Sequence, residues 1–198
     1  MIRELHPIDF PRILRMGKGG FENRVYARSE LDSSTSRRIS LVMDSARAMG
    51  LADGYSSLTK SDGSHISALT IAKRLYGPSS WEISRLHATT DPTDDLSDMI
   101  NALFEAVRAQ GGNQLSARVL AGDQTGTHLR RAGIHLAHNE TLYQGHGTDA
   151  LEDALLSLRP KRKEDDHGVF LLYSAATPPE VRALTGMTMD QWMDSKWI

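Results

Sequence analysis

The sequence contains no cysteine, no long apolar run and no marked excess of charge of either sign. A chain without cysteine has no disulfide, no thiolate zinc site, no iron–sulfur cluster and no cysteine nucleophile. None of its apolar stretches approaches the 18 residues that a membrane-spanning helix needs. Its 23 basic and 25 acidic residues give a net charge of −2, unlike a generally basic nucleic-acid-binding protein or a disordered acidic chain. We therefore expect a globular protein that binds neither nucleic acid nor a membrane.

The N-terminus also lacks the apolar run of a signal peptide, because Arg3, Glu4 and Asp9 fall within it. We therefore expect a cytoplasmic protein. With 198 residues, of which 39% are apolar, the chain is long enough for one domain with a substantial core. The sequence predicts a single domain over residues 1–198, in which residues 145–166 are a polar insertion and residues 187–198 an apolar tail.

The first half of the chain predicts a strand, helices and a hairpin. A strand is expected over 2–6, a helix over 7–16 with Asp9 as its cap, and a helix over 36–50. Residues 17–20 contain three glycines but lack the Gly-Lys-Ser/Thr ending of a phosphate-binding loop, so we expect a turn there. Two antiparallel strands are expected over 51–59 and 65–73, joined by a turn at 61–63.

The second half alternates strands and helices. We expect strands over 81–88, 115–120 and 134–143, with helices over 93–110 and 125–132 between them. A helical crossover joins parallel strands, so the strands 81–88 and 115–120 should be parallel neighbours. The fold class predicted is α/β (α+β), with a mixed, mostly antiparallel sheet and helices on both faces.

The C-terminal part has two apolar segments. The continuous apolar run Val169–Tyr173 predicts a strand buried on both faces, and residues 169–174 should complete the sheet. A last helix should begin at Pro178-Pro179 and end at Leu184. The tail after it either packs on its own domain or docks against a second copy or a second domain. Its large apolar residues are Met187, Met189, Trp192, Met193 and Trp197.

The order of these elements carries a family resemblance. The segments concerned are the strand 82–88, the helix 99–111, the strand 115–120, the stretch Leu129-Arg130-Arg131-Ala132-Gly133-Ile134, the strand end 140–143 and the opening residues 2–10. Together they resemble the GNAT superfamily of acyl-CoA-dependent N-acetyltransferases over roughly 140 residues. The resemblance implies a GNAT-like fold, acetyl-CoA as cofactor and a small-molecule or protein amine as substrate.

The resemblance also implies where the cofactor would lie. The backbone of Leu86, His87 and Ala88 would hydrogen-bond the pantetheine arm. The N–H groups of Leu96 and Ser97, at the start of the next helix, would hold the pyrophosphate, because unsatisfied N–H donors and the helix dipole favour an anion.

The loop before that helix departs from the family pattern. The places of its Arg or Gln and its two small residues hold Asp91, Asp94 and Leu96, and Pro92 removes a donor N–H. Residues 89–98 contain four carboxylates and no cation, so they would repel a pyrophosphate. Two interpretations remain open: an altered cofactor loop, or a loop in which Asp91, Thr93 or Asp94 only caps the helix.

No catalytic residue can be assigned from the sequence. Where the family often has a tyrosine that protonates the departing thiolate, this chain has Leu129, and the adjacent His128 would point elsewhere on a helix. Tyr143 could supply a hydroxyl but is more simply a packing residue. His135 and His138, three apart on an expected strand, would face opposite sides, so no metal site is predicted.

Two functions follow. The first is an acyl-CoA-dependent N-acetyltransferase. The second is a non-catalytic GNAT-like module that has lost acetyl-CoA binding and acts in ligand binding or in pairing with a second domain or a homodimer partner. A groove beside the strand 81–88 would favour the first, and a filled gap there the second.

Overall fold

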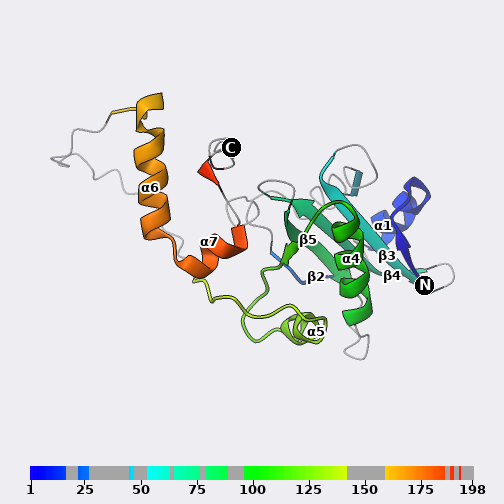
Figure 1. The fold of residues 1–198 in the computed structure, drawn as a ribbon. Helices are drawn as coiled ribbons and strands as arrows, with labels where there is room; N and C mark the ends of the chain where they lie inside the picture. The colour runs from blue at the N-terminus through cyan, green and yellow to red at the C-terminus, as the bar shows by residue number, and fades with distance from the viewer. Residues whose placement is uncertain are drawn as a thin grey trace, which may run out of the picture.

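The computed structural model describes residues 1–16, 22–26, 45–46, 53–62, 65–75, 79–88, 96–141, 159–185, 188–189 and 192. Their centre is a six-stranded sheet in which the strand order is β1-β3-β4-β5-β2, with β6 also paired to β5 (Figure 1). The strands are β1 Ile2–Glu4, β2 Glu22–Asn23, β3 Tyr55–Asp62, β4 His65–Arg74, β5 Ser80–Ala88 and β6 Gln114–Ser116. All pairs are antiparallel except β5 with β6, so the predicted mixed sheet and its parallel pair are confirmed.

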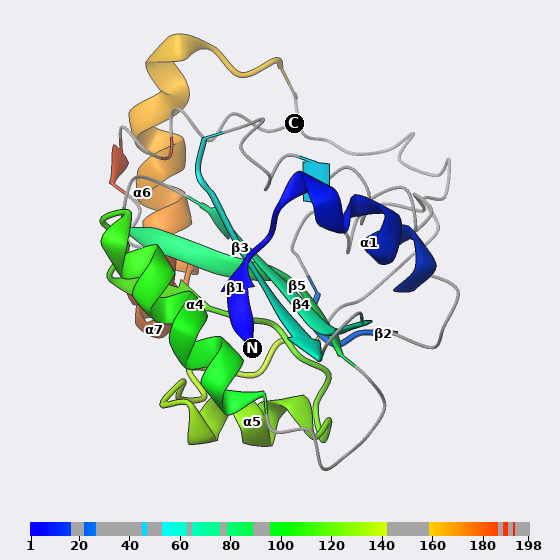
Figure 2. The ribbon, with the colours of Figure 1, turned by 90° about the vertical axis from the view of Figure 1, so that its right-hand side faces the viewer.

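Helices cover both faces of the sheet. On one face, α4 (Ser97–Ala109) packs over β3 and β4, and on the other lies α1 (Phe10–Met16) beside β4 (Figure 2). The buried residues of α4 are spaced three and four apart and meet the apolar side chains of β5. A smaller cluster joins α1 to β4 through Ile13, Leu69 and Ile71. Burial of these two apolar faces fixes which side of each strand points to which helix.

The expected cap at Asp9 has a larger role than capping alone. Its carboxylate is buried and accepts the backbone N–H of His6 at 3.1 Å, which caps the short 3-10 helix Pro7–Asp9. Arg3 of β1 donates two hydrogen bonds to it, each 2.7 Å long. The ion pair therefore ties β1 to the start of α1.

A β-bulge interrupts β5 in its middle. Ile83 pairs with Ala72 and Arg85 with Ile71, so Ser84 has no place in the register with β4. Apolar side chains of β5 therefore keep to the α4 face on both sides of the bulge, with spacings of two, three and two: Trp81, Ile83, Leu86 and Ala88. A bulge bends a strand and increases its twist, so the two halves of β5 run in different directions.

Three predicted strands are corrected by the structure. The strand expected over 115–120 is only Gln114–Ser116, and residues 134–141 of the strand expected over 134–143 are not in a strand. The apolar run Val169–Tyr173 lies in helix α6 (Asp166–Ala176) rather than in a last strand. Periodicity cannot separate a short buried strand from a helix in such a run, and here the helix continues through Ala175 and Ala176.

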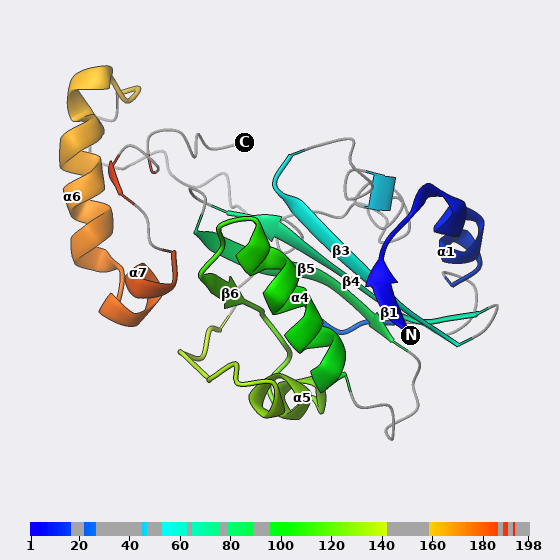
Figure 3. The ribbon, with the colours of Figure 1, turned by 45° about the vertical axis from the view of Figure 1, so that its right-hand side comes forward.

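The C-terminal helices stand beside the sheet rather than in it. Helix α6 lies away from the strands, and α7 (Pro179–Thr185), close to the expected helix 178–184, follows it (Figures 1 and 3). Phe170 of α6 contacts the ring of Trp192 at a centroid distance of 5.7 Å, and Trp192 is buried. Trp192 of the apolar tail thus packs on α6. No helix in the described ranges is long and apolar enough to cross a membrane.

Several sequence predictions lie outside the described residues. They are the helix 36–50 apart from residues 45–46, which are helical, the insertion up to residue 158, the loop 89–95, Tyr143, and the tail residues Met187, Met193 and Trp197.

Candidate cofactor groove beside strand β5

The outer edge of β5 changes partner at the bulge. Its first residues, 80–82, pair with residues 114–116 of the parallel β6. Its last residues, His87 and Ala88, pair with Asn23 and Glu22 of the antiparallel β2. Residues 117–120, which follow β6, are not in a strand. The strands that begin as neighbours therefore separate toward the C-terminal end of β5.

Residues 22–26, here called the bridging segment, lie in this separation. Arg24 N–H donates to the Leu86 carbonyl oxygen at 2.9 Å, and Tyr26 N–H donates to the Arg118 carbonyl oxygen at 2.9 Å. The segment thus bonds to β5 on one side and to the chain beyond β6 on the other. Two strand spacings amount to about 10 Å, which is the separation that one inserted strand requires.

Asn23 fixes the bridging segment to β5 with its side chain. The Asn23 Oδ1 atom accepts the backbone N–H of Leu86 at 3.0 Å and that of Val25 at 3.4 Å. Val25 is fully buried and belongs to the core cluster of β5 and α4. The segment is therefore held by hydrogen bonds on both edges and by one buried apolar side chain.

The space between the end of β5 and the chain beyond β6, which residues 22–26 occupy, is called the groove below. Ion pairs stabilise its side beyond β6. Arg118 pairs with the fully buried Glu82 of β5 and, at 3.2 Å, with Glu140. Lys73 of β4 lies 3.8 Å from Glu82. A hydrogen bond from His138 at 2.7 Å and the charge of Arg118 hold the pKa of Glu140 below its ordinary value. Two carboxylates therefore fix the arginine whose carbonyl oxygen receives the bridging segment.

A second charged group links the bridging segment to helix α5 (Thr125–Arg131). Burial alone would raise the pKa of Asp123, but hydrogen bonds from Thr125 and the charges of Arg24 and His128 lower it. The Thr125 N–H donates to Asp123 Oδ1 at 2.6 Å, at the first turn of α5. Arg24 thus interacts with the carboxylate that caps the start of α5 as well as with β5.

The predicted pyrophosphate residues lie at the start of α4. Leu96 is its N-cap residue and Ser97 its first residue, and both are buried. The Ser97 Oγ donates to the carbonyl oxygen of His128 at 3.4 Å, which ties α4 to α5. Among the described residues no side chain caps this helix end. The capping and altered-loop interpretations both depend on residues 89–95, outside the described chain.

The structure brings the predicted pantetheine residues together with residues that the sequence did not single out. Leu86, His87 and Ala88 form the end of β5, as expected, and their neighbours are Asn23 and Arg24. A two-residue strand such as β2 has no periodicity, so its pairing carries no sequence signal. The three-residue gap between Ile83 and Leu86 was a usable signal, because it marks the bulge that opens the groove.

The structure also shows the surroundings of Leu129 and His128, the residues at and beside the position of the family's tyrosine. Leu129 is buried in the core cluster, so this position supplies no proton. His128 is buried as well, and its charge acts on Asp123. In the part of the chain that the structure describes, no three His, Asp or Glu residues lie together so that they could hold a metal ion.

Acetyl-CoA does not fit this groove in the arrangement described. An extended ligand beside β5 needs the outward N–H and C=O groups of Leu86. Both are taken within the chain, the N–H by Asn23 Oδ1 and the C=O by Arg24 N–H. The side chain of Val25 also fills the apolar space below.

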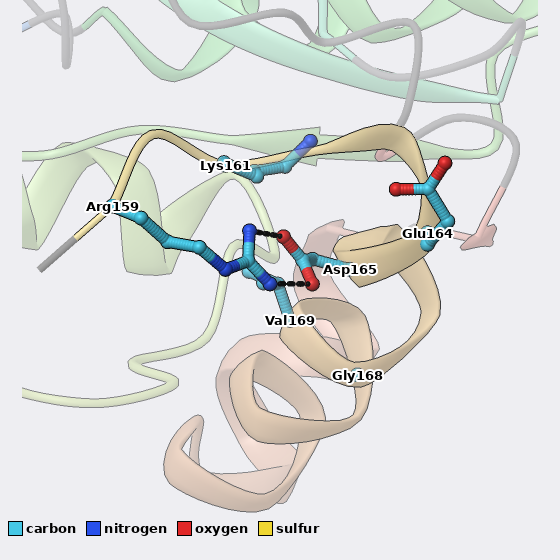
Figure 4. A pocket seen from close by; sticks show the side chains of 6 residues that line it. All are labelled: Arg159, Lys161, Glu164, Asp165, Gly168 and Val169. Atoms are coloured by element: carbon cyan, nitrogen blue, oxygen red, sulfur yellow. Dashed lines mark hydrogen bonds and ion pairs between the residues drawn. The ribbon is translucent and has the colours of Figure 1, made fainter.

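A shallow hollow at the start of α6 is a weaker candidate (Figure 4). Two hydrogen bonds of 2.7 Å join Arg159 to Asp165 and, with the N–H of Arg162, lower the pKa of Asp165 to about 2. Lys161 donates a hydrogen bond to Asp166. Both basic residues of the hollow, Arg159 and Lys161, are therefore paired with carboxylates of its own segment. Its lining residues are Arg159, Lys161, Glu164, Asp165, Gly168 and Val169.

Comparison with solved structures identifies the fold, whereas comparison of the sequence finds no match. No protein-family model matches the chain, and no curated protein matches its sequence. Among solved structures, a protein described as an acetyltransferase of the GNAT family from Desulfovibrio desulfuricans aligns at 14% identity and a TM-score of 0.50, over 67% of this chain and 83% of that one. An aminoglycoside 6′-N-acetyltransferase from Acinetobacter haemolyticus aligns at 8% identity and 0.50, over 75% and 99%. A protein described as a transcriptional regulator from Bacillus halodurans aligns at 12% identity and 0.50, over 74% and 99%.

The match to some acetyltransferases is shorter. The chain spans 59% of the length of the aminoglycoside 6′-N-acetyltransferase from Enterococcus faecium, with 58% of this chain aligned at 15% identity and a TM-score of 0.43. At such identities the likeness concerns the fold, since one fold can carry many activities. With a mixed sheet, a parallel β5–β6 pair and α4 between them, the chain has the fold of the GNAT acetyltransferases.

Proposed function

We propose that this chain is an acyl-CoA-dependent N-acetyltransferase that transfers an acetyl group to an amine of a small molecule or a protein. The observation that carries the proposal is the separation of β5 from the chain beyond β6. In the arrangement described, residues 22–26 occupy the edge of β5 at Leu86, so the proposal requires that they leave before an extended ligand binds there. The bridging segment uses this edge through an amide oxygen and an amide N–H. A pantetheine arm carries the same two kinds of group.

The proposal is tested by calorimetric titration of the purified protein with acetyl-CoA and with free CoA. We expect a dissociation constant in the micromolar range, which corresponds to a binding free energy of about −8 kcal/mol. Asp94→Gly is the companion variant, because removing one carboxylate from residues 89–98 should tighten binding to a pyrophosphate. Glu180→Gln removes an exposed carboxylate of α7, outside the groove, and serves as the charge control.

Activity is measured by the release of free thiol when acetyl-CoA and a panel of amines are added. Because the protein contains no cysteine, every thiol detected comes from CoA. Thiol release that requires both the protein and an amine supports the proposal. Absence of CoA binding by wild type and by Asp94→Gly contradicts it.

A second function is favoured by one observation, the filled edge of β5. If residues 22–26 never leave Leu86, the domain is a non-catalytic module with the GNAT fold, and the buried Leu129 in place of a tyrosine is consistent with that. The titration separates the two functions. A module in which residues 22–26 stay on the edge of β5 would bind neither acetyl-CoA nor free CoA.

A further inference from the structure

We propose that the bridging segment, residues 22–26, is a built-in plug that competes with the acyl donor for the edge of β5. The inference rests on the proposed function, because it concerns the same groove. It adds that the groove exists in two states: a plugged state, which the structure describes, and an open state in which Leu86 is available to a ligand. Asn23 is the residue that pins the plugged state.

The hydrogen bonds of the plug support this competition. They satisfy both outward backbone groups of Leu86, and a third bond reaches the Arg118 carbonyl oxygen on the opposite side. A strand edge offers each of these groups once, so an extended ligand and the plug cannot use them together. The plug thus occupies the full width of the groove between β5 and Arg118.

The plug also has the features of a segment that can leave. It pairs with β5 over two residues only, Glu22 and Asn23. Its one side chain in the core cluster is Val25, which is small, and the charge of Arg24 is shared with Asp123 at the groove margin. Its pairing with β5 is shorter than that of the ten-residue strand β4 on the other edge. Short edge segments open more readily than core strands.

The energetic consequence is a reduced apparent affinity for the donor. When only a fraction of the molecules is open, the apparent dissociation constant equals the intrinsic one divided by that fraction. Loss of the Asn23 side chain removes two hydrogen bonds of the plug, including the one to Leu86. We expect Asn23→Ala to bind acetyl-CoA about tenfold more tightly than wild type. Asn23→Asp keeps an acceptor oxygen at the same place but adds a negative charge, so, unlike Asn23→Ala, it should show no gain in affinity for acetyl-CoA.

The decisive experiment locks the plug with a disulfide. Asn23 and His87 are Cα partners, and because Arg24 N–H bonds to Leu86, they form the pair without mutual hydrogen bonds. Such pairs have Cα atoms about 4.5 Å apart, within the range that a disulfide spans. In a chain without cysteine, Asn23→Cys with His87→Cys introduces the only two thiols. The same preparation is titrated with acetyl-CoA oxidised and reduced, and each single variant under both conditions is the control.

Three results are possible, and each decides something. In the first result, the reduced form binds acetyl-CoA, oxidation lowers its affinity about tenfold or more, and the single variants show no redox effect. This result supports both the plug and the proposed function. Equal binding by the oxidised and reduced forms overturns the plug and leaves the proposed function standing. No binding by either form, by Asn23→Ala or by wild type overturns the proposed function, and the plug with it.

Discussion

Asp9 combines two roles in one carboxylate. It accepts the His6 N–H at the start of its own helix and two hydrogen bonds from Arg3 of β1, and the charge of Arg12 lies 3.6 Å away. The hydrogen bonds from Arg3 lower the pKa of Asp9 below 3.8 despite its burial. The capping role could be predicted from the sequence. The ion pair could not, because it depends on how β1 meets the helix.

Asp9→Asn should lower the free energy of unfolding by about 2 kcal/mol at pH 7, because Arg3 loses its buried partner while remaining part-exposed. The pKa of Asp9 is lower in the folded state, so its contribution is complete above about pH 4 and disappears as pH falls through the folded pKa. Urea denaturation at several pH values checks this. The difference from wild type should shrink as the pH falls below about 4. The exposed Asp53→Asn should change stability by less than about 0.5 kcal/mol. A difference from wild type that is independent of pH would contradict the ion-pair argument.

In the groove, too, one part could be predicted from neighbouring residues in the sequence and another depends on residues far apart in the chain. The positions of Leu86, His87 and Ala88 at the end of a strand follow from the alternation of β5, which the sequence displays. Their partners Asn23 and Arg24 lie 63 and 62 positions from Leu86 in the chain, and no local pattern links them. The backbone groups of the cofactor strand could thus be predicted, and what occupies them could not.

The junction between α4 and β6 depends on Gly112, the second of the two glycines that end the helix. A Cβ atom at this position would lie 2.3 Å from Val107 Cγ1 and 2.7 Å from Trp81 Cδ1. Both neighbours are buried, so neither can move away cheaply. Gly112→Ala should therefore destabilise the fold by about 1–3 kcal/mol, measured by chemical denaturation.

Gly168→Ala is the matched substitution in α6, where nothing lies within 4 Å of the added Cβ. Because alanine favours a helix over glycine, it should stabilise by about 0.5–1 kcal/mol or leave stability unchanged. If Gly112→Ala were as mild as Gly168→Ala, the close approach of the α4 end to Trp81 would be refuted.

Elements with strong periodicity or a clear turn could be predicted, and those without either could not. The hairpin of β3 and β4 could be predicted from its strand-favouring composition and its turn. Helix α4 has three-and-four spacing, and β5 alternates apolar with polar residues except at the bulge. The run Val169–Tyr173 has neither, and its continuous apolar character suited a buried strand as well as a helix. The structure gives a helix with Leu171 and Leu172 exposed, where a strand completing the sheet would have buried both.

At the scale of the molecule, the described residues form a sheet domain and a helical arm, α6 and α7, that stands beside it (Figure 3). Burial differs sharply between them: Leu103 of α4 has no exposed surface, whereas 68% of the Leu172 side chain is exposed. The sheet domain therefore supplies most of the apolar burial that stabilises the fold. In the described residues, the arm contacts Trp192 through the ring of Phe170.

Because of this difference in burial, replacing leucine by alanine should lower the free energy of unfolding much more in the sheet domain than in the arm. Leu103→Ala removes a fully buried side chain and leaves a cavity between α4 and the sheet, so it should cost about 2–5 kcal/mol. Leu172→Ala should cost less than about 0.5 kcal/mol, because its side chain is already exposed to water. Urea denaturation followed by circular dichroism measures both variants. A cost above about 2 kcal/mol for Leu172→Ala would mean that this leucine is buried, as it would be in a last strand of the sheet or beneath a partner. A small loss of unfolding free energy would agree with the structure, in which residues 169–174 belong to a helix outside the sheet.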